Sequence, residues 1–151
     1  IIRNALFRLP VKNRTDIIPW VTYTDPELAH VGLTEVDART QHGDSIRVLR
    51  WQFHDNDRAV AEAKTEGLVK LVTLKNGRII GCSIVGPNAG DQIAVWTLAV
   101  TRKLKVSAIA GMVLPYPTFG EAGKRAAMTY YAGVAQKPFI RKVIGFLKNF
   151  G

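Results

Sequence analysis

Two β-branched segments meet at an Asn-Gly turn in Gly67-Leu68-Val69-Lys70-Leu71-Val72-Thr73-Leu74-Lys75-Asn76-Gly77-Arg78-Ile79-Ile80-Gly81-Cys82-Ser83-Ile84-Val85-Gly86. Asn-Gly favours the short turn whose twist matches a pair of antiparallel strands. We therefore predict a β-hairpin over residues 67–86, with Lys75-Asn76-Gly77 as its turn. Cys82 is the one cysteine of the chain and lies in the second apolar segment, where a buried thiol is usually inert.

On the N-terminal side of this hairpin, the sequence predicts two strands and a short helix. Residues 18–23 are rich in strand-forming side chains and end at the turn signal Asp25-Pro26. Thr34 suits the N-cap of a helix that runs to about His42. Residues 46–53 alternate apolar and charged side chains, which indicates a half-buried strand.

On the C-terminal side, the apolar period becomes helical. Residues 91–104 predict a mostly buried helix, and Ser107 is the expected cap of a shorter helix over residues 108–114. Thr118 is the expected cap of a third helix that ends near Tyr131. Strands come first and helices last, so we predict an α+β fold: an antiparallel sheet with helices packed on one face.

Composition indicates a folded domain with a basic surface. The chain has 151 residues, is 47% hydrophobic and carries a formal net charge of +9. Its cations are spread along the sequence, without zinc-finger spacing or an aromatic RNA-binding signature, so no nucleic-acid partner is expected. The absence of a secretory signal and of an apolar run of about 20 residues favours a cytoplasmic location.

The familiar signatures of a complete active site are missing. The sequence has no G-x-G-x-x-G after a strand and no phosphate-binding P-loop. His30, His42 and His54 are separated from one another and from Cys82, so no metal site is expected, and each histidine is expected at the surface or at a helix cap. These residues alone cannot form a redox or hydrolytic site.

The segment Pro115-Tyr116-Pro117-Thr118-Phe119-Gly120-Glu121 combines a phenol, two prolines and a carboxylate. Each proline fixes its own φ and restricts the residue before it, so Tyr116 has little backbone freedom. Thr118 and Glu121 have the spacing of a capping box. The segment is either a plain loop-to-helix cap or a device that holds the phenol at a defined place.

Three stretches, in order, resemble one family. Residues 20–35 are similar to the opening "strand, D/N-P-E, x-x-x-V-G-x-T-E" of the C-terminal dimerisation domain of the pyridine nucleotide–disulfide oxidoreductases, which include dihydrolipoamide dehydrogenase, glutathione reductase and mercuric reductase. Residues 67–91 resemble its hairpin and "G-x-x-A-G-E" helix start, and residues 115–121 resemble its H-P-T-x-x-E motif. The resemblance covers nearly the whole chain.

The resemblance implies a domain taken from a longer enzyme. Residues 1–10 would be the end of the preceding FAD-domain helix and a linker, residues 11–137 the dimerisation domain, and residues 138–151 a basic amphipathic tail helix. The parent would use FAD and NAD(P)H and form a homodimer through this domain. The fragment alone is expected to bind no cofactor and to be inactive.

Tyr116 is the main departure from the family pattern, because the family has His there. A phenol is a poor base at neutral pH, so dihydrolipoamide or glutathione turnover is not favoured. Tyrosine at this position, with Asp57-Arg58-Ala59 and the basic tail, resembles mercuric-reductase-like flavoproteins. The C-terminal Cys pair that delivers Hg(II) in mercuric reductases is missing, which favours an unassigned NAD(P)H-dependent reductase.

The resemblance also implies roles for the motif. Tyr116 would enter the partner subunit's flavin–disulfide site as hydrogen-bond donor or weak acid, and Glu121 would orient it. Pro115, Tyr116 and Pro117 would face the pyrimidine end of the flavin, with a cis Tyr116–Pro117 bond.

The helices from Asp91 and Thr118 are the expected dimer contacts. Trp96, Met128 and Tyr130 are either the apolar anchors of this contact or part of the core.

A second hypothesis treats the chain as a standalone interaction module. Arg141, Lys142 and Lys148 lie opposite an apolar face in the tail, which is typical of a helix that binds an acidic partner or a membrane surface. In the first hypothesis neither a membrane nor a nucleic acid is a partner.

Overall fold

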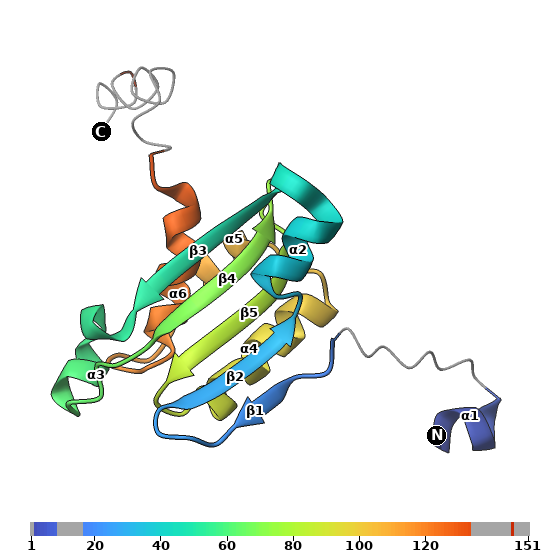
Figure 1. The fold of residues 1–151 in the computed structure, drawn as a ribbon, viewed down its shortest axis with the longest axis horizontal. Helices are drawn as coiled ribbons and strands as arrows, with labels where there is room; N and C mark the ends of the chain where they lie inside the picture. Colours follow the sequence, from blue (N-terminus) through green and yellow to red (C-terminus); the bar gives the residue numbers. More distant parts are fainter. Residues whose placement is uncertain (1, 9–16, 134–145, 147–151) are drawn as a thin grey trace.

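A computed structural model describes residues 2–8, 17–133 and 146, and its body is a five-stranded antiparallel sheet (Figure 1). The strand order is β1-β2-β5-β4-β3. The strands are β1 (Trp20–Thr22), β2 (Glu27–Gly32), β3 (Ile46–Gln52), β4 (Leu68–Leu74) and β5 (Ile79–Gly86). The expected α+β fold with an antiparallel sheet is confirmed.

The predicted hairpin forms the centre of the sheet. Leu71 pairs with Cys82 across β4 and β5, and the turn lies at Lys75-Asn76-Gly77 as predicted. Gly77 adopts a φ of 84°, which glycine tolerates at no steric cost. The Asn76 side chain accepts a hydrogen bond from the Arg78 N–H at 3.0 Å, so the turn residues themselves set the strand register.

Strand β2 was not predicted, and it changes the position of His30. β2 follows the cis Asp25–Pro26 bond and pairs with β5, which places His30 opposite Ser83. His30 is only 6% exposed, so its expected surface or capping position is wrong. Its ring nitrogens lie 2.9 Å from Ser83 Oγ and 2.9 Å from the Gly32 carbonyl, and these partners allow the polar ring to be buried.

Three helices cover one face of the sheet, as predicted, and one short helix lies on the other face (Figure 1). Helices α4 (Ala89–Thr101), α5 (Val106–Ala110) and α6 (Glu121–Met128) lie over the main core. Helix α2 (Glu35–His42) lies on the opposite face, where its Ala38 packs with Ile46, Val72 and Ile80. The remaining helices are α1 (Ile2–Phe7) and α3 (Asp57–Ala61), with 3₁₀ turns at Gly43–Ser45, Phe53–Asp55 and Thr129–Tyr131.

The main core lies between strands β2, β3, β4 and β5 on one side and helices α4 and α6 on the other. Trp96 of α4 is 3% exposed, and Phe53, Leu71 and Ile84 are fully enclosed. Trp96 therefore belongs to the core and is not a dimer anchor, because its indole is covered within the chain. Of the other expected anchors, Tyr130 is partly buried and donates to the Lys75 carbonyl at 2.6 Å, whereas Met128 is exposed.

Two predicted helix starts differ from the structure. Helix α5 begins at Val106 and not after Ser107, because the Val106 N–H is bound to the Gly77 carbonyl of the hairpin at 2.9 Å. Helix α6 begins at Glu121 after Gly120, and no side chain caps it. Residues 118–120 form a tight turn before it, with the Glu121 N–H bound to the Thr118 carbonyl, so Thr118 is not the N-cap.

The cap predicted at Thr34 is confirmed, since its hydroxyl accepts the Asp37 N–H. Residues 2–7 form a helix, as the N-terminal expectation required, while the assignment of residues 1–10 to a preceding FAD domain stays a prediction. The tail helix expected over residues 138–151 lies outside the described residues, apart from Phe146.

Candidate active-site motif

The Pro115–Glu121 motif forms the loop between α5 and α6, and its tip is exposed. Pro115, Tyr116 and Pro117 are all exposed, Tyr116 to 71%. The Tyr116–Pro117 bond is cis, as expected. Beyond the tip, Phe119 turns inward and packs edge-on against Phe53 of the core at 6.4 Å between ring centroids. The loop is thus anchored at its base and presents its tip to solvent.

The Tyr116 phenol is held by a residue far away in the sequence. Its hydroxyl donates to Asp57 Oδ2 at 2.8 Å, and Asp57 is the first residue of α3. Hydrogen bonds to a carboxylate are stronger than those between neutral groups, so an exposed side chain still has a preferred orientation. The sequence indicated Asp57 only through the family resemblance of Asp57-Arg58-Ala59. Its contact with Tyr116, 59 positions away, was not predicted.

Asn56 ties the same two segments together a second time. Its side-chain oxygen accepts the Ala59 N–H at 3.0 Å and so caps α3, while its Nδ2 donates to the Thr118 carbonyl at 3.1 Å. Asn56 is 4% exposed, and both ends of its amide have a protein partner. An Asn before an acidic first turn is a recognisable N-cap signal, but the bond to Thr118 spans 62 residues and has no local signal.

Glu121 supports the loop from its other end. Its Oε2 accepts the Thr118 N–H at 3.2 Å, which is one half of the predicted capping box. Among the described residues, Asp57 accepts the hydrogen bond that orients the phenol. Glu121 acts on Tyr116 only through its negative charge. Three of the four predicted site residues therefore lie in one loop and Glu121 begins the helix that follows it, and Asp57 and Asn56 of the α3 segment bind this loop.

The electrostatics of the site favour a protonated phenol. The hydrogen bond to Asp57 raises the pKa of Tyr116 above its ordinary value, and the negative charges of Asp57 and Glu121 act in the same direction. A phenol whose pKa is raised keeps its proton at neutral pH. The group is therefore a hydrogen-bond donor and not a base.

Among the described residues, no group of three or more His, Cys, Asp or Glu side chains could hold a metal ion. In the same part of the chain, no helix is long and apolar enough to cross a membrane.

Residues 18–127 match the family described as "Pyridine nucleotide-disulphide oxidoreductase, dimerisation domain". The chain belongs to this family. The predicted resemblance and the fold are thereby confirmed.

Curated relatives include both dihydrolipoyl dehydrogenases and a mercuric reductase. The chain is 36% identical over 127 residues to the mitochondrial dihydrolipoyl dehydrogenase of Caenorhabditis elegans, covering 83% of this chain and 26% of that protein. It is 35% identical over 135 residues to the mercuric reductase of Bacillus cereus, covering 89% of this chain and 21% of that protein. The chain thus spans about a quarter of the length of these relatives.

Solved structures share the same fold. LpdA from Mycobacterium tuberculosis has a TM-score of 0.77 at 24% identity, with 84% of this chain and 28% of that chain covered. The HOCl-induced flavoprotein disulfide reductase RclA from Escherichia coli has a TM-score of 0.74 at 24% identity, with 85% of this chain and 30% of that chain covered.

Proposed function

We propose that this chain is the dimerisation domain of an FAD-dependent NAD(P)H oxidoreductase and that it lends Tyr116 and Glu121 to the active site of a partner subunit. The observation that carries the proposal is the exposed Pro115–Pro117 tip, whose phenol is held in place by Asp57. A loop that is rigid at its base and open at its tip suits a contact with another chain.

The tip has the chemistry to touch a flavin at its edge. Pro115 and Pro117 have no N–H, so the backbone of this tip can offer a flavin three carbonyl oxygens and only one N–H, that of Tyr116. The pyrimidine end of a flavin presents an N–H between two carbonyls, which can donate to such an oxygen. These residues fit an edge contact and not an enclosing site, in agreement with the lack of a dinucleotide-binding motif in this chain.

In this proposal the flavin supplies the electron transfer, and the chain supplies position and a proton. Tyr116 offers its hydroxyl proton to a developing negative charge on the acceptor, and Asp57 orients the ring beforehand. Glu121 holds the base of the loop by accepting a hydrogen bond from the Thr118 N–H. Because the phenol remains protonated at neutral pH, the reaction would use it as a donor or weak acid.

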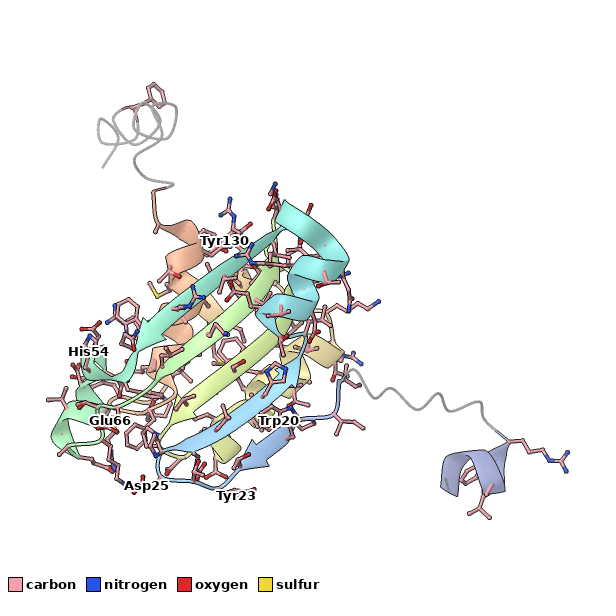
Figure 2. All side chains as sticks on the ribbon, viewed as in Figure 1. Trp20, Tyr23, Asp25, His54, Glu66 and Tyr130 are labelled. Carbon is pink, nitrogen blue, oxygen red and sulfur yellow. The ribbon has the colours of Figure 1, made fainter. Side chains whose placement is uncertain are left out.

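We further propose that the homodimer forms through an apolar surface around α4, here named the α4 surface. Its exposed members are Trp20, Tyr23, Val95, Leu98 and Val113. Hollows of about 500 Å³ and about 240 Å³ lie on the two sides of α4, toward β1 and toward α5–α6 respectively. Trp20 and Tyr23 lie along the β1 edge of the sheet (Figure 2). Aromatic side chains beside hollows are the usual anchors of protein interfaces.

Replacing Tyr116→Phe in the full-length parent tests the active-site role. We expect kcat to fall by about a hundredfold, the low end of what a positioned proton donor contributes. Tyr131→Phe, at an exposed tyrosine outside both the motif loop and the α4 surface, is the control and should leave kcat unchanged. Unchanged turnover and an unchanged pH profile in Tyr116→Phe would eliminate the donor role.

The described residues give no specific support to the standalone interaction module, whose basic tail lies almost wholly outside them.

A further inference from the structure

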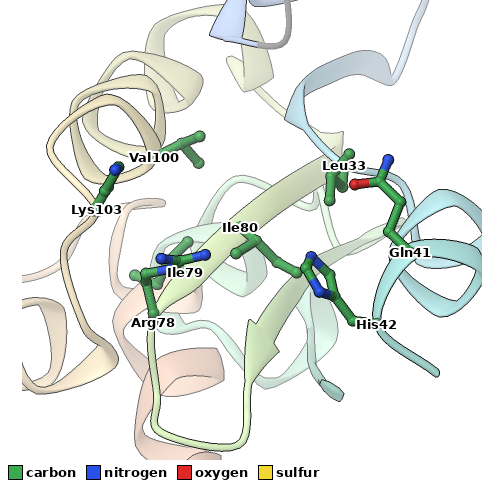
Figure 3. Close-up of a pocket in the computed structure, with 8 residues that line it drawn as sticks. All are labelled: Leu33, Gln41, His42, Arg78, Ile79, Ile80, Val100 and Lys103. Carbon is green, nitrogen blue, oxygen red and sulfur yellow. The ribbon is translucent and has the colours of Figure 1, made fainter. Parts of the chain in front are cut away.

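A further hollow lies at the opposite end of the sheet from Tyr116, and cationic side chains line it. It is about 270 Å³ in volume and lies between the end of α2, the start of β5 and the end of α4 (Figure 3). Its lining residues are Leu33, Gln41, His42, Arg78, Ile79, Ile80, Val100 and Lys103. Three elements far apart in the sequence therefore contribute to it.

The hollow has an apolar floor and a polar rim. Ile79, Ile80 and Val100 are buried and form the floor. Arg78 and His42 point toward each other past Ile80, and Lys103 lies on the α4 side (Figure 3). A pocket with an apolar floor and a few convergent polar groups is the usual form of a small-molecule site.

The positive charge at the rim is not balanced within the described chain. The ion pairs among the described residues include neither Arg78 nor Lys103. Between Gly67 and Gly120 the sequence holds a single acidic residue, Asp91. Glu35, on α2, pairs with Arg39, Arg50 and Lys70. An anion in the hollow would therefore meet cations that have no competing carboxylate partner.

Main-chain hydrogen bonds join the two segments that carry Arg78 and Lys103. The Ile79 N–H binds the Leu104 carbonyl at 2.9 Å, and Arg78 forms a bridge with Lys105, so the hairpin is joined to the end of α4. The main-chain positions of Arg78 and Lys103 are consequently fixed relative to each other.

Lys103 also occupies a position that normally requires glycine. The Lys103 N–H binds the Val100 carbonyl and the Leu104 N–H binds the Ala99 carbonyl, which is the Schellman pattern at a helix C-terminus. Lys103 has a φ of 55°, the left-handed region that a side chain disfavours. A cation near a helix C-terminus is favourable, but Arg102 already supplies one. The strained lysine therefore points to a function for its side chain.

We propose that this hollow binds the phosphate of a small phosphomonoester, with Arg78 and Lys103 on the phosphate and the organic part on the apolar floor. A phosphomonoester carries a charge of about −1.5 to −2 at neutral pH, which matches two permanent cations, whereas a carboxylate carries one. Guanidinium offers paired donors to phosphate oxygens, and Gln41 and His42 add further polar side chains at the rim. The small volume of the hollow, about 270 Å³, favours a small molecule over a peptide or a nucleic acid.

The test is calorimetric titration of the 151-residue chain with phenyl phosphate, inorganic phosphate and benzoate. We expect saturable binding in the order phenyl phosphate, then inorganic phosphate, then benzoate, because only the first has both the double charge and an apolar part. Equal affinity for phenyl phosphate and benzoate, or no saturable binding of either phosphate, would overturn the proposal. The measurement is independent of the flavin-site proposal, since it requires no turnover.

Lys103→Gly separates binding from folding. Glycine relaxes the left-handed backbone, so the melting temperature should stay the same or rise, while phenyl phosphate binding should weaken by about tenfold or more. Arg78→Gln should weaken binding similarly. Arg102→Gln removes the same charge one residue away from the hollow and should leave affinity nearly unchanged; a loss as large as that of Lys103→Gly would mean that only the overall charge attracts the anion.

Discussion

At the scale of single residues, the contact between Tyr116 and Asp57 is the most specific feature of the molecule. The pair joins the motif loop to α3 and keeps an exposed phenol protonated and oriented. Asn56 holds the same two segments beneath it with a buried amide. Where the family pattern has an imidazole that takes up protons, this chain thus holds a phenol beside a carboxylate, which alters the available proton chemistry and leaves the loop position intact.

Asp57→Asn should lower the pKa of Tyr116 toward its ordinary value of about 10, because the negative charge and the strong acceptor are both lost. The measurement is an alkaline absorbance titration of the chain, which has four tyrosines. Subtracting the titration curve of the matching Tyr116→Phe variant removes the signal of the other three and leaves that of Tyr116. In the native chain the raised pKa means that the folded state holds this proton more tightly than the unfolded state. The interaction of Tyr116 with Asp57 therefore stabilises the fold fully at pH values below the ordinary pKa of tyrosine. This stabilisation is lost as the pH rises through the pKa of Tyr116 in the folded state.

Asp55→Asn is the matched control for that titration, since Asp55 is an exposed carboxylate two residues away that pairs with His54. It should leave the Tyr116 titration in place. Equal shifts in both variants would show that Asp57 acts only as one more surface charge.

At the scale of elements, the close packing of α6 on α4 sets the position of the motif loop. Gly123 faces Trp96, and a Cβ built on it would lie 2.7 Å from Trp96 Cζ2. The indole is 3% exposed and has no room to move, so the helix approaches it as closely as glycine permits. Because α6 begins at Glu121, the last residue of the motif, this contact helps to position the motif loop.

Gly123→Ala should destabilise the fold by about 1–3 kcal/mol through overpacking, even though alanine is the better helix former by about 1 kcal/mol. Urea denaturation followed by circular dichroism measures the change. The same substitution at Gly120 meets open space, with Thr118 Oγ1 at 3.9 Å, and the backbone there has a helical φ of −61°. Gly120→Ala should be neutral or stabilising. A neutral Gly123→Ala would contradict the tight α4–α6 packing.

At the scale of the whole molecule, two kinds of surface can be distinguished, and the motif tip and the cationic hollow lie at opposite ends of the sheet. The α4 surface and the Pro115–Pro117 tip are apolar and aromatic, which suits contact with a second copy of the chain. The hollow at Arg78 and Lys103 is cationic and lies at the far end.

Leu98→Glu should abolish dimerisation of the parent while the domain remains folded, since Leu98 is 56% exposed and no core contact is lost. In a two-fold interface the substitution introduces the charge twice, at a surface that must exclude water. Sedimentation velocity measures the mass. Val36→Glu, at a side chain of α2 that is 73% exposed on the other face, is the control and should remain dimeric. A dimeric Leu98→Glu variant would place the interface elsewhere.

The sequence alone determined the features that arise from neighbouring residues. The Asn76-Gly77 turn, the Thr34 cap and the period of the α4 helix depend on contacts within a few positions, and all three were predicted correctly. The ordered motifs were also enough to indicate the family and to single out Tyr116 and Glu121.

Only the tertiary structure decided features that depend on pairing between distant segments. Strand β2 contains few β-branched residues and exists because β5 lies beside it, which buries His30 against Ser83. The true starts of α5 and α6 follow from the hairpin contact at Val106 and the packing of Phe119. The hydrogen bonds that join Asp57 and Asn56 to the motif loop connect residues about 60 positions apart, and such contacts appear only when the fold has brought the two segments together.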